Sequence, residues 1–162
     1  MRTLVVDMDD VSLDDGPAAN HLDWMYYLRG KHPDFKINLF VIPKRCTPEW
    51  IDQLHFIPWI NVCMHGWHHA EGEVITPSMV KEWDYASIYK GPNWQITQEE
   101  LDMFKKAGWV VAVKEHLRHT VKQWELADPR VFHGHVWIES DWKKLDAILD
   151  ADTDYKFIQE VL

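Results

Sequence analysis

The sequence predicts an α/β fold in which helices cover a mainly parallel sheet or barrel. Short apolar runs alternate along the chain with segments that carry helix-capping residues, which is the pattern of strand–helix–strand units. Several of the apolar runs also end in Asp, His or Lys, and the carboxyl ends of parallel strands meet at one rim of a sheet or barrel. The 162 residues fit a single domain, 1–162, with one core.

The first half of the chain contains three expected strands and two expected helices. An apolar run at 4–6 ends at Asp7, and Pro17 suits the first turn of a helix. Thr47 followed by Pro48 is typical of a helix start, because the Thr side chain caps free N–H groups and Pro lacks one. We therefore expect strands at 4–6, 37–42 and 57–64, and helices at 18–31 and 48–55.

The second half continues the alternation. Thr97 and Glu100 fit a capping box, and Gly108 follows the end of the helix that this box opens. Residues 115–125 are basic and His-rich, and we expect them to be partly helical. The remaining expectations are helices at 76–83, 97–106 and 140–149, a strand ending at 90, and strands at 109–113, 131–135 and 155–161.

The composition argues against several classes of partner. The formal net charge is -9, which disfavours a nucleic-acid backbone or an anionic membrane surface. No run reaches the length of a membrane span, and the N-terminus lacks the apolar stretch of a signal peptide, so we expect a soluble cytoplasmic protein. Cys46 and Cys63 form no metal-binding or redox motif.

The segment 65–69, His-Gly-Trp-His-His, is the part of the chain around which the expected chemistry gathers. It follows an expected buried strand, and in a helical turn His65 and His69 would share one face. Two neutral imidazoles are a good start for a zinc site, which takes about three protein ligands and keeps one position open for catalysis. We expect the third ligand from the acidic stretch 7–10, Asp-Met-Asp-Asp. Other strand ends expected on the same rim carry Lys90, His133 and His135.

Together these residues resemble the polysaccharide deacetylases with a NodB homology domain, which form carbohydrate esterase family four. The family's Thr-Phe-Asp-Asp-Gly motif corresponds to 7–11, Asp-Met-Asp-Asp-Val, and its His-(Ser/Thr)-x-x-His motif corresponds to 65–69. An Arg-x-Pro-like turn corresponds loosely to 90–94, and a late strand with a catalytic His corresponds to 131–135. The resemblance covers nearly the whole chain. It implies one polysaccharide-deacetylase-like domain, folded as a distorted, incomplete TIM-like (β/α) barrel with mainly parallel strands.

The resemblance also implies a reaction, in which metal-activated water removes an acyl group, chiefly acetyl, from an N-acetylated sugar or a related amide. The implied ligands of a divalent metal are Asp10, His65 and His69. Zinc suits this set best, and cobalt, nickel and iron accept similar ligands. Asp9 would be the general base, Lys90 would position it, and His133 or His135 would protonate the leaving amine. Residues expected to contact the carbohydrate or small amide are Trp67, Pro92, Trp94 and Trp137.

Departures from the family's motifs keep two other interpretations open. Val11 replaces the family's Gly and Lys90 its Arg, which leaves the substrate undefined. The first motif also resembles that of haloacid-dehalogenase-type magnesium phosphatases, with Asp7 as nucleophile and Asp9 as acid/base, although this gives no role to the histidines. The third interpretation is a non-catalytic, deacetylase-like module that binds carbohydrate.

Overall fold

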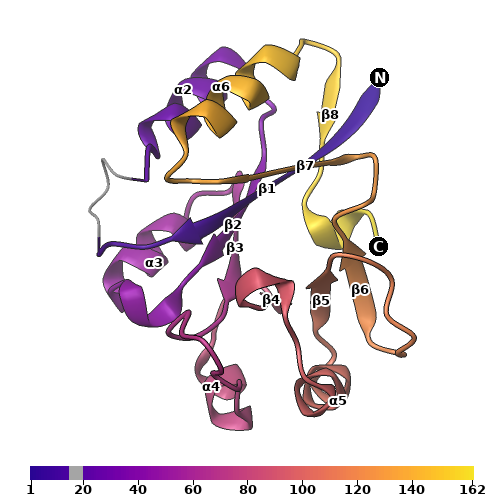
Figure 1. The fold of residues 1–162 in the computed structure, drawn as a ribbon. Coiled ribbons are helices and arrows are strands. Elements are labelled where there is room, and N and C mark those ends of the chain that lie inside the picture. The colour runs from indigo at the N-terminus through magenta and orange to yellow at the C-terminus, as the bar shows by residue number, and fades with distance from the viewer. Residues whose placement is uncertain (15–19) are drawn as a thin grey trace.

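A curled parallel sheet forms the centre of the computed structural model, which describes residues 1–14 and 20–162 (Figure 1). Seven strands follow one another in the order β6-β5-β4-β3-β2-β1-β7, all neighbouring pairs are parallel, and β8 pairs with the first residues of β1. The sheet forms a half barrel, which confirms the incomplete barrel expected from the sequence. The strands are β1 (Arg2–Val11), β2 (Ile37–Val41), β3 (Ile60–His65), β4 (Ile88–Lys90), β5 (Val110–Val113), β6 (Lys122–Glu125), β7 (Val131–His135) and β8 (Thr153–Tyr155).

Five α-helices in the described part of the chain pack on the outer side of this curl (Figure 1). Thr47 and Thr97 cap two of them as expected, since each side chain accepts a hydrogen bond from a backbone N–H three residues later. None of the described helices combines the length and the apolar character needed to cross a bilayer. The helices are α2 (Asp23–Lys31), α3 (Pro48–His55), α4 (Pro77–Glu82), α5 (Gln98–Ala107) and α6 (Glu139–Ile148), and short 3₁₀ turns are η1 (Pro43–Arg45), η2 (Pro92–Trp94) and η3 (Ile158–Glu160).

The alternation of side chains along the strands divides the core into two clusters. Successive residues of a strand point to opposite faces, so in β1 Val6 and Met8 join the outer cluster beneath the helices, whereas Val5 joins an inner cluster. Asp7 and Asp9 have the same parity as Val5 and are also buried. The inner cluster is formed by Val5, Phe40, Cys63, Ile88, Val110, Ala112, Trp124 and Ile158. The inside of the curl is therefore apolar near the middle of the strands and charged toward their carboxyl ends.

A network of amides closes the opposite end of the curl. Asn38 is fully buried, and its Nδ2 donates to the Val6 carbonyl at 2.9 Å. Its Oδ1 accepts from the backbone N–H of Ile158 at 3.0 Å and from Asn61 Nδ2 at 2.9 Å. Asn61 Nδ2 also lies 2.8 Å from the Oε1 of Gln159. Because Asn38 and Asn61 are buried and bond to residues of η3, the network fixes η3 against the inner cluster.

The structure differs from three expectations about local structure. Residues 115–125 contain β6 rather than a partial helix, because the Gln123 side chain binds both the N–H and the carbonyl of Leu117 and shapes a tight loop before the strand. The expected strand at 155–161 is replaced by β8 and η3. β1 continues through the acidic residues to Val11 instead of ending at 6. The expected helix start at Pro17 lies outside the described residues, and α2 begins at Asp23.

Replacing Asn38 with Ala tests the amide network. The change removes hydrogen bonds and leaves the N–H of Ile158 buried without this acceptor, so we expect the free energy of unfolding to fall by about 2–3 kcal/mol. Urea denaturation followed by circular dichroism measures it. Gln98→Ala, at an exposed position, is the control and should change stability by less than about 0.5 kcal/mol. Equal stability of the two variants would contradict this role of Asn38.

Candidate metal centre

Asp9 and Asp10, near the end of β1, face the same site because the strand is irregular there. Neighbouring residues of a regular strand point to opposite faces. The register between β1 and β2 shifts between Met8 and Val11, and Asp10 adopts a left-handed conformation with φ 67°. Asp tolerates this conformation better than most residues. The bulge thus turns the Asp10 carboxylate toward the inner face, beside that of Asp9.

A first triad, formed by Asp10, His65 and His69, offers three ligand atoms within 4.8 Å of one another. The Nε2 atoms of His65 and His69 lie 3.0 and 3.4 Å from Asp10 Oδ1. His65 Nδ1 lies 2.9 Å from the Lys90 carbonyl, which can only accept, so Nδ1 is the protonated nitrogen. In a neutral His65 this leaves the Nε2 lone pair facing the triad, which is the arrangement that metal-binding histidines use.

The electrostatics of the first triad favour positive charge. Burial opposes ionisation of Asp10, but hydrogen bonds from His65, His69 and Trp137 outweigh it and hold the pKa of the carboxyl well below its usual range. Burial would lower the pKa of His65, but the charge of Asp9 and the hydrogen bond to Asp10 raise it above its usual value of 6.5. The donor set and this environment fit a divalent transition metal such as zinc or cobalt.

The loop that carries His69 is held by a residue that the sequence analysis missed. Glu73 accepts hydrogen bonds from the backbone N–H groups of Trp67, His68 and His69, at 2.9, 2.9 and 3.0 Å. Residues 66–69 form a bend with positive φ at Gly66 (60°) and His69 (59°), so the helical turn considered for this segment is not formed. A Cβ at Gly66 would lie 2.5 Å from Glu73 Oε1, which explains the glycine. Nothing in the spacing of Glu73 indicated this contact, because it depends on the shape of the loop.

Lys90 is completely buried and joins two carboxylates of β1. Its Nζ lies 2.5 and 2.6 Å from the two oxygens of Asp7, and 2.7 Å from Asp9 Oδ1. The same atom lies 3.9 Å from the ring centroid of Phe40 and 4.1 Å from that of Trp94, so aromatic faces enclose the ammonium. Lys90 therefore fixes the Asp9 carboxylate through Oδ1 and leaves Oδ2 on the side of the histidines.

Asp7 is the structural counter-ion of Lys90. Burial alone would raise the pKa of Asp7, but the Lys90 charge and the nearby His133 hold it well below the usual value of 3.8. Its ionised form thus stabilises the fold at pH values above about 3.8, and this stabilisation is lost as the pH falls through the lower pKa of the folded state. Asp7 is also 0% exposed, so a phosphate group has no access to it. The structure gives the phosphatase interpretation no usable nucleophile.

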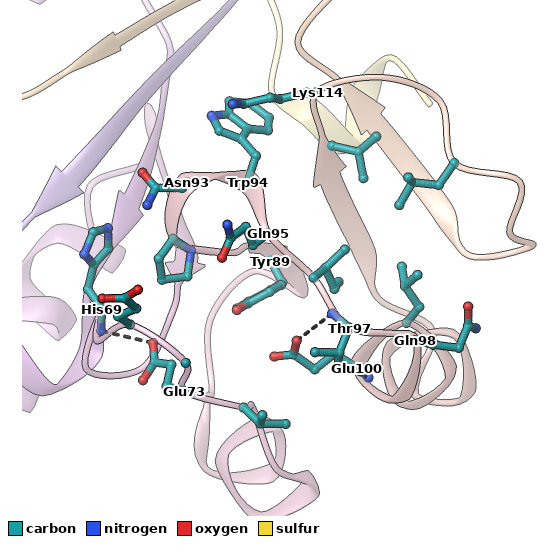
Figure 2. A pocket seen from close by; sticks show the side chains of 18 of the residues that line it. His69, Glu73, Tyr89, Asn93, Trp94, Gln95, Thr97, Gln98, Glu100 and Lys114 are labelled. Carbon is teal, nitrogen blue, oxygen red and sulfur yellow. Dashed lines mark hydrogen bonds between the residues drawn. The ribbon is translucent and has the colours of Figure 1, made fainter.

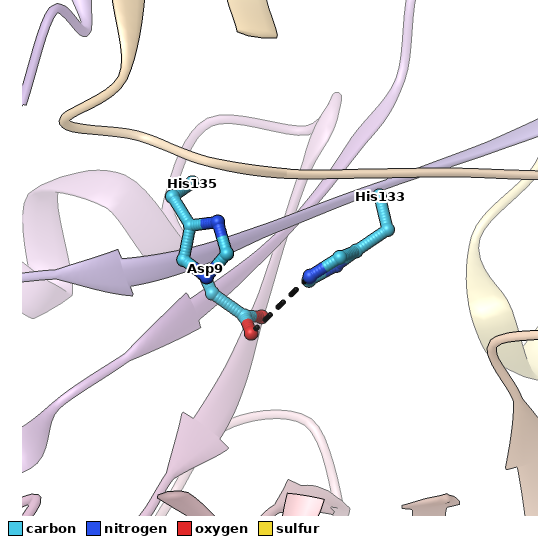
Figure 3. A group of neighbouring side chains, drawn as sticks. All are labelled: Asp9, His133 and His135. Atoms are coloured by element: carbon cyan, nitrogen blue, oxygen red, sulfur yellow. Dashed lines mark ion pairs between the residues drawn. The ribbon is translucent and has the colours of Figure 1, made fainter. Parts of the chain in front are cut away.

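Asp9, His133 and His135 form a second triad (Figure 3). It lies beside the first, since His65 Nε2 is 3.9 Å from Asp9 Oδ2. In the β1–β7 register, His133 pairs with Asp7 and His135 pairs with Asp9, which places both rings on the inner side. His133 Nε2 lies 3.9 Å from Asp9 Oδ2, and His135 Nε2 lies 3.8 Å from Asp10 Oδ2. The Asp141 carboxylate accepts the backbone N–H of His135 at 2.9 Å and anchors the end of the strand.

The four residues expected to contact a substrate lie in three different environments. Trp67 is 5% exposed and packs in the outer cluster, so its bulk serves packing and not the wall of a groove. Trp137 is 53% exposed, and its Nε1 donates to Asp10 Oδ2 at 3.0 Å. Pro92 and Trp94 line a cavity of about 1180 Å³ (Figure 2). His69 lines the same cavity, which therefore opens beside the first triad.

Comparison with solved structures shows a similar fold. No protein-family model and no curated protein sequence matches the chain. A family 4 acetyl xylan esterase from Clostridium thermocellum, solved in complex with a cobalt ion, superposes with a TM-score of 0.60 and 10% sequence identity, over 99% of this chain and 90% of that chain. The similarity thus extends over nearly the whole fold, and at this identity it shows the fold alone.

Replacing Glu73 with Gln tests whether the loop positions His69. The substitution keeps the shape of the side chain but removes the charge and one of the two acceptor oxygens that bind the three N–H groups. We expect the affinity for Zn²⁺ to fall about 10-fold or more, as for other residues that orient metal ligands. Isothermal titration calorimetry measures it. Glu71→Gln, two residues away and exposed, should bind Zn²⁺ like the wild type, and equal affinities in both variants would contradict the role of Glu73.

We expect the effects of substitutions at Lys90 and Asp7 on the free energy of unfolding to depend on each other. Lys90→Met leaves two buried carboxylates without their cation, so we expect the free energy of unfolding to fall by about 3–5 kcal/mol. Adding Asp7→Asn removes one of those charges, and the double variant should be more stable than Lys90→Met alone. Urea unfolding of the wild type and the three variants completes the cycle. If the loss of unfolding free energy in the double variant equals the sum of the losses in the two single variants, the pair is not coupled.

Proposed function

We propose that this protein is a metal-dependent hydrolase that removes acetyl groups from a carbohydrate or a related small amide. The observation that carries the proposal is the first triad beside the free oxygen of Asp9. It combines a two-histidine, one-carboxylate ligand set with a second carboxylate that Lys90 holds in place. The fold of the cobalt-bound acetyl xylan esterase supports the same reaction class.

The residues of the first triad would bind the metal. Asp10, His65 and His69 would hold Zn²⁺ or Co²⁺ through one oxygen and two nitrogens, in which His65 is oriented by the Lys90 carbonyl and Asp10 by Trp137. When bound, such a metal polarises an acyl carbonyl and makes water more acidic.

Proton transfer would be divided between β1 and β7. Asp9 has one oxygen occupied by Lys90 and would use Oδ2 to take the proton of the attacking water. We assign the proton donor for the leaving group to His135. It is the more exposed of the two histidines on β7, with 35% of its side chain accessible against 17% for His133, and its Nε2 faces Asp10. His133 would fill the space between Asp7 and Asp9 and limit their movement.

The cavity beside His69 would receive the acetylated chain. Trp94 supplies aromatic surface there, and Gln95, Gln98 and Lys114 supply hydrogen-bond donors. Aromatic surface combined with a few polar groups is typical of sites for small ligands. An uncharged, acetylated saccharide fits this lining, and the open shape would admit more than one sugar unit.

The first experiment separates an enzyme from a binding module. Acetate release from acetylated xylan, N-acetylated chitooligosaccharides and p-nitrophenyl acetate is measured with Zn²⁺- or Co²⁺-loaded protein. Asp9→Asn should lower turnover by about 100-fold or more, the range for loss of a general base, while one metal ion per chain stays bound at the first triad. His65→Ala/His69→Ala should lose both metal and turnover. Asp14→Asn, on an exposed turn, is the matched control and should match the wild type.

Two outcomes would contradict the proposal. A protein that binds the metal and releases no acetate from any of these substrates would be a binding module. Full turnover in Asp9→Asn would remove Asp9 from the reaction and require a different base.

A further inference from the structure

The second triad has the residue types of a metal site, apart from the roles in proton transfer proposed for its members. Asp9, His133 and His135 bring one oxygen and two nitrogens within 4.8 Å of one another, which is the same donor set as the first triad. Two donors of one tetrahedral zinc ion are about 3.3–3.5 Å apart. The 3.9 Å between Asp9 Oδ2 and His133 Nε2 is close to this, so small side-chain rotations suffice.

The two triads are contiguous and share their carboxylates. Asp9 Oδ2 lies 3.9 Å from His65 Nε2 in the first triad and 3.9 Å from His133 Nε2 in the second. Asp10 uses Oδ1 toward His65, while its Oδ2 lies 3.8 Å from His135 Nε2. Each carboxylate therefore faces both groups of histidines, an arrangement suited to two neighbouring cations.

The charges around the two triads differ, so we expect the two triads to differ in their affinity for a cation. With neutral imidazoles, Lys90 is the one cation among the described residues that pairs with the carboxylates of Asp7, Asp9 and Asp10. The cluster then carries a net charge of -2, which one divalent ion would neutralise. Lys90 Nζ lies 2.7 Å from Asp9 and so repels a cation at the second triad more strongly than at the first. In the described part of the chain no Lys or Arg pairs with Asp10, and Trp137 and the histidines are the partners of its oxygens. The first triad should therefore fill first.

We propose that Asp9, His133 and His135 bind a second divalent transition-metal ion, more weakly than the first triad does, and that filling this site stops hydrolysis. The inhibition rests on the proposed function. An Asp9 oxygen that coordinates a metal no longer takes a proton from water, and a His135 nitrogen that coordinates a metal no longer donates one. Metal in excess would then switch off the reaction that the first ion supports.

The experiment is an equilibrium dialysis of metal-free protein against increasing Zn²⁺, with elemental analysis of both compartments. The wild type should bind in two steps, about one and then about two ions per chain. His133→Gln/His135→Gln should stop at about one ion with the first step unchanged. His65→Gln/His69→Gln should lose the tighter step. His68→Gln/His116→Gln removes two exposed imidazoles outside the triads and should bind like the wild type.

Stoichiometry and acetate release together separate the two claims. Acetate release by the wild type should fall to under about a tenth as the second step fills. A wild type that stops at one ion, with the first step lost only in His65→Gln/His69→Gln, would overturn the second site and leave the proposed function intact. Binding of no ion would overturn both. Two ions with undiminished acetate release would overturn the inhibition. Thermal unfolding of each variant verifies that a lost step does not come from a lost fold.

Discussion

The buried ammonium of Lys90 is the interaction on which the inner face depends. Strand β1 carries three carboxylates within four residues, and two of them, Asp7 and Asp9, are buried on its inner face. Such a group of charges is unstable unless a cation is enclosed with it. Lys90 supplies that cation from β4, across the intervening strands β2 and β3, and Phe40 and Trp94 shield it. One side chain thus ties distant strands together and sets which oxygen of Asp9 remains free.

A backbone irregularity does the rest of the positioning. A regular β1 would send Asp9 and Asp10 to opposite faces, and the first triad would then lose its carboxylate. The bulge between Met8 and Val11 and the left-handed Asp10 correct this, and the loop with left-handed Gly66 and His69 completes the triad from the other side. Strained conformations of this kind persist where surrounding contacts hold them. Glu73 and Trp137 are those contacts here, since one binds the loop and the other binds Asp10.

The sequence predicted those features that follow from local rules and from topology. The helix starts at Thr47 and Thr97 obey capping chemistry, and the meeting of Asp10, His65 and Lys90 follows from parallel strands ending at one rim. What escaped prediction depends on contacts across the chain. Glu73 accepts hydrogen bonds from three backbone N–H groups that point to one place only because the loop bends. Gln123 bonds to the backbone of Leu117 and stabilises a loop where a helix was expected. The partner of Asp7, Lys90, lies 83 residues away along the chain and is evident only in the fold.

The period of two along each strand explains how a chain at 10% identity can keep the fold of a metal-bound esterase. In β3 the inward positions are Asn61, Cys63 and His65, which lie successively in the amide network, the apolar cluster and the first triad. β1 repeats the last two layers with Val5 and then Asp7 and Asp9. Only these inward positions need a particular residue type, which is an amide, an apolar residue or a metal-binding residue according to their height along the strand. Outward positions need only be apolar and of suitable size. The constraint on function therefore falls on few residues, and the chemistry at the rim can change without disturbing the amides that close the other end.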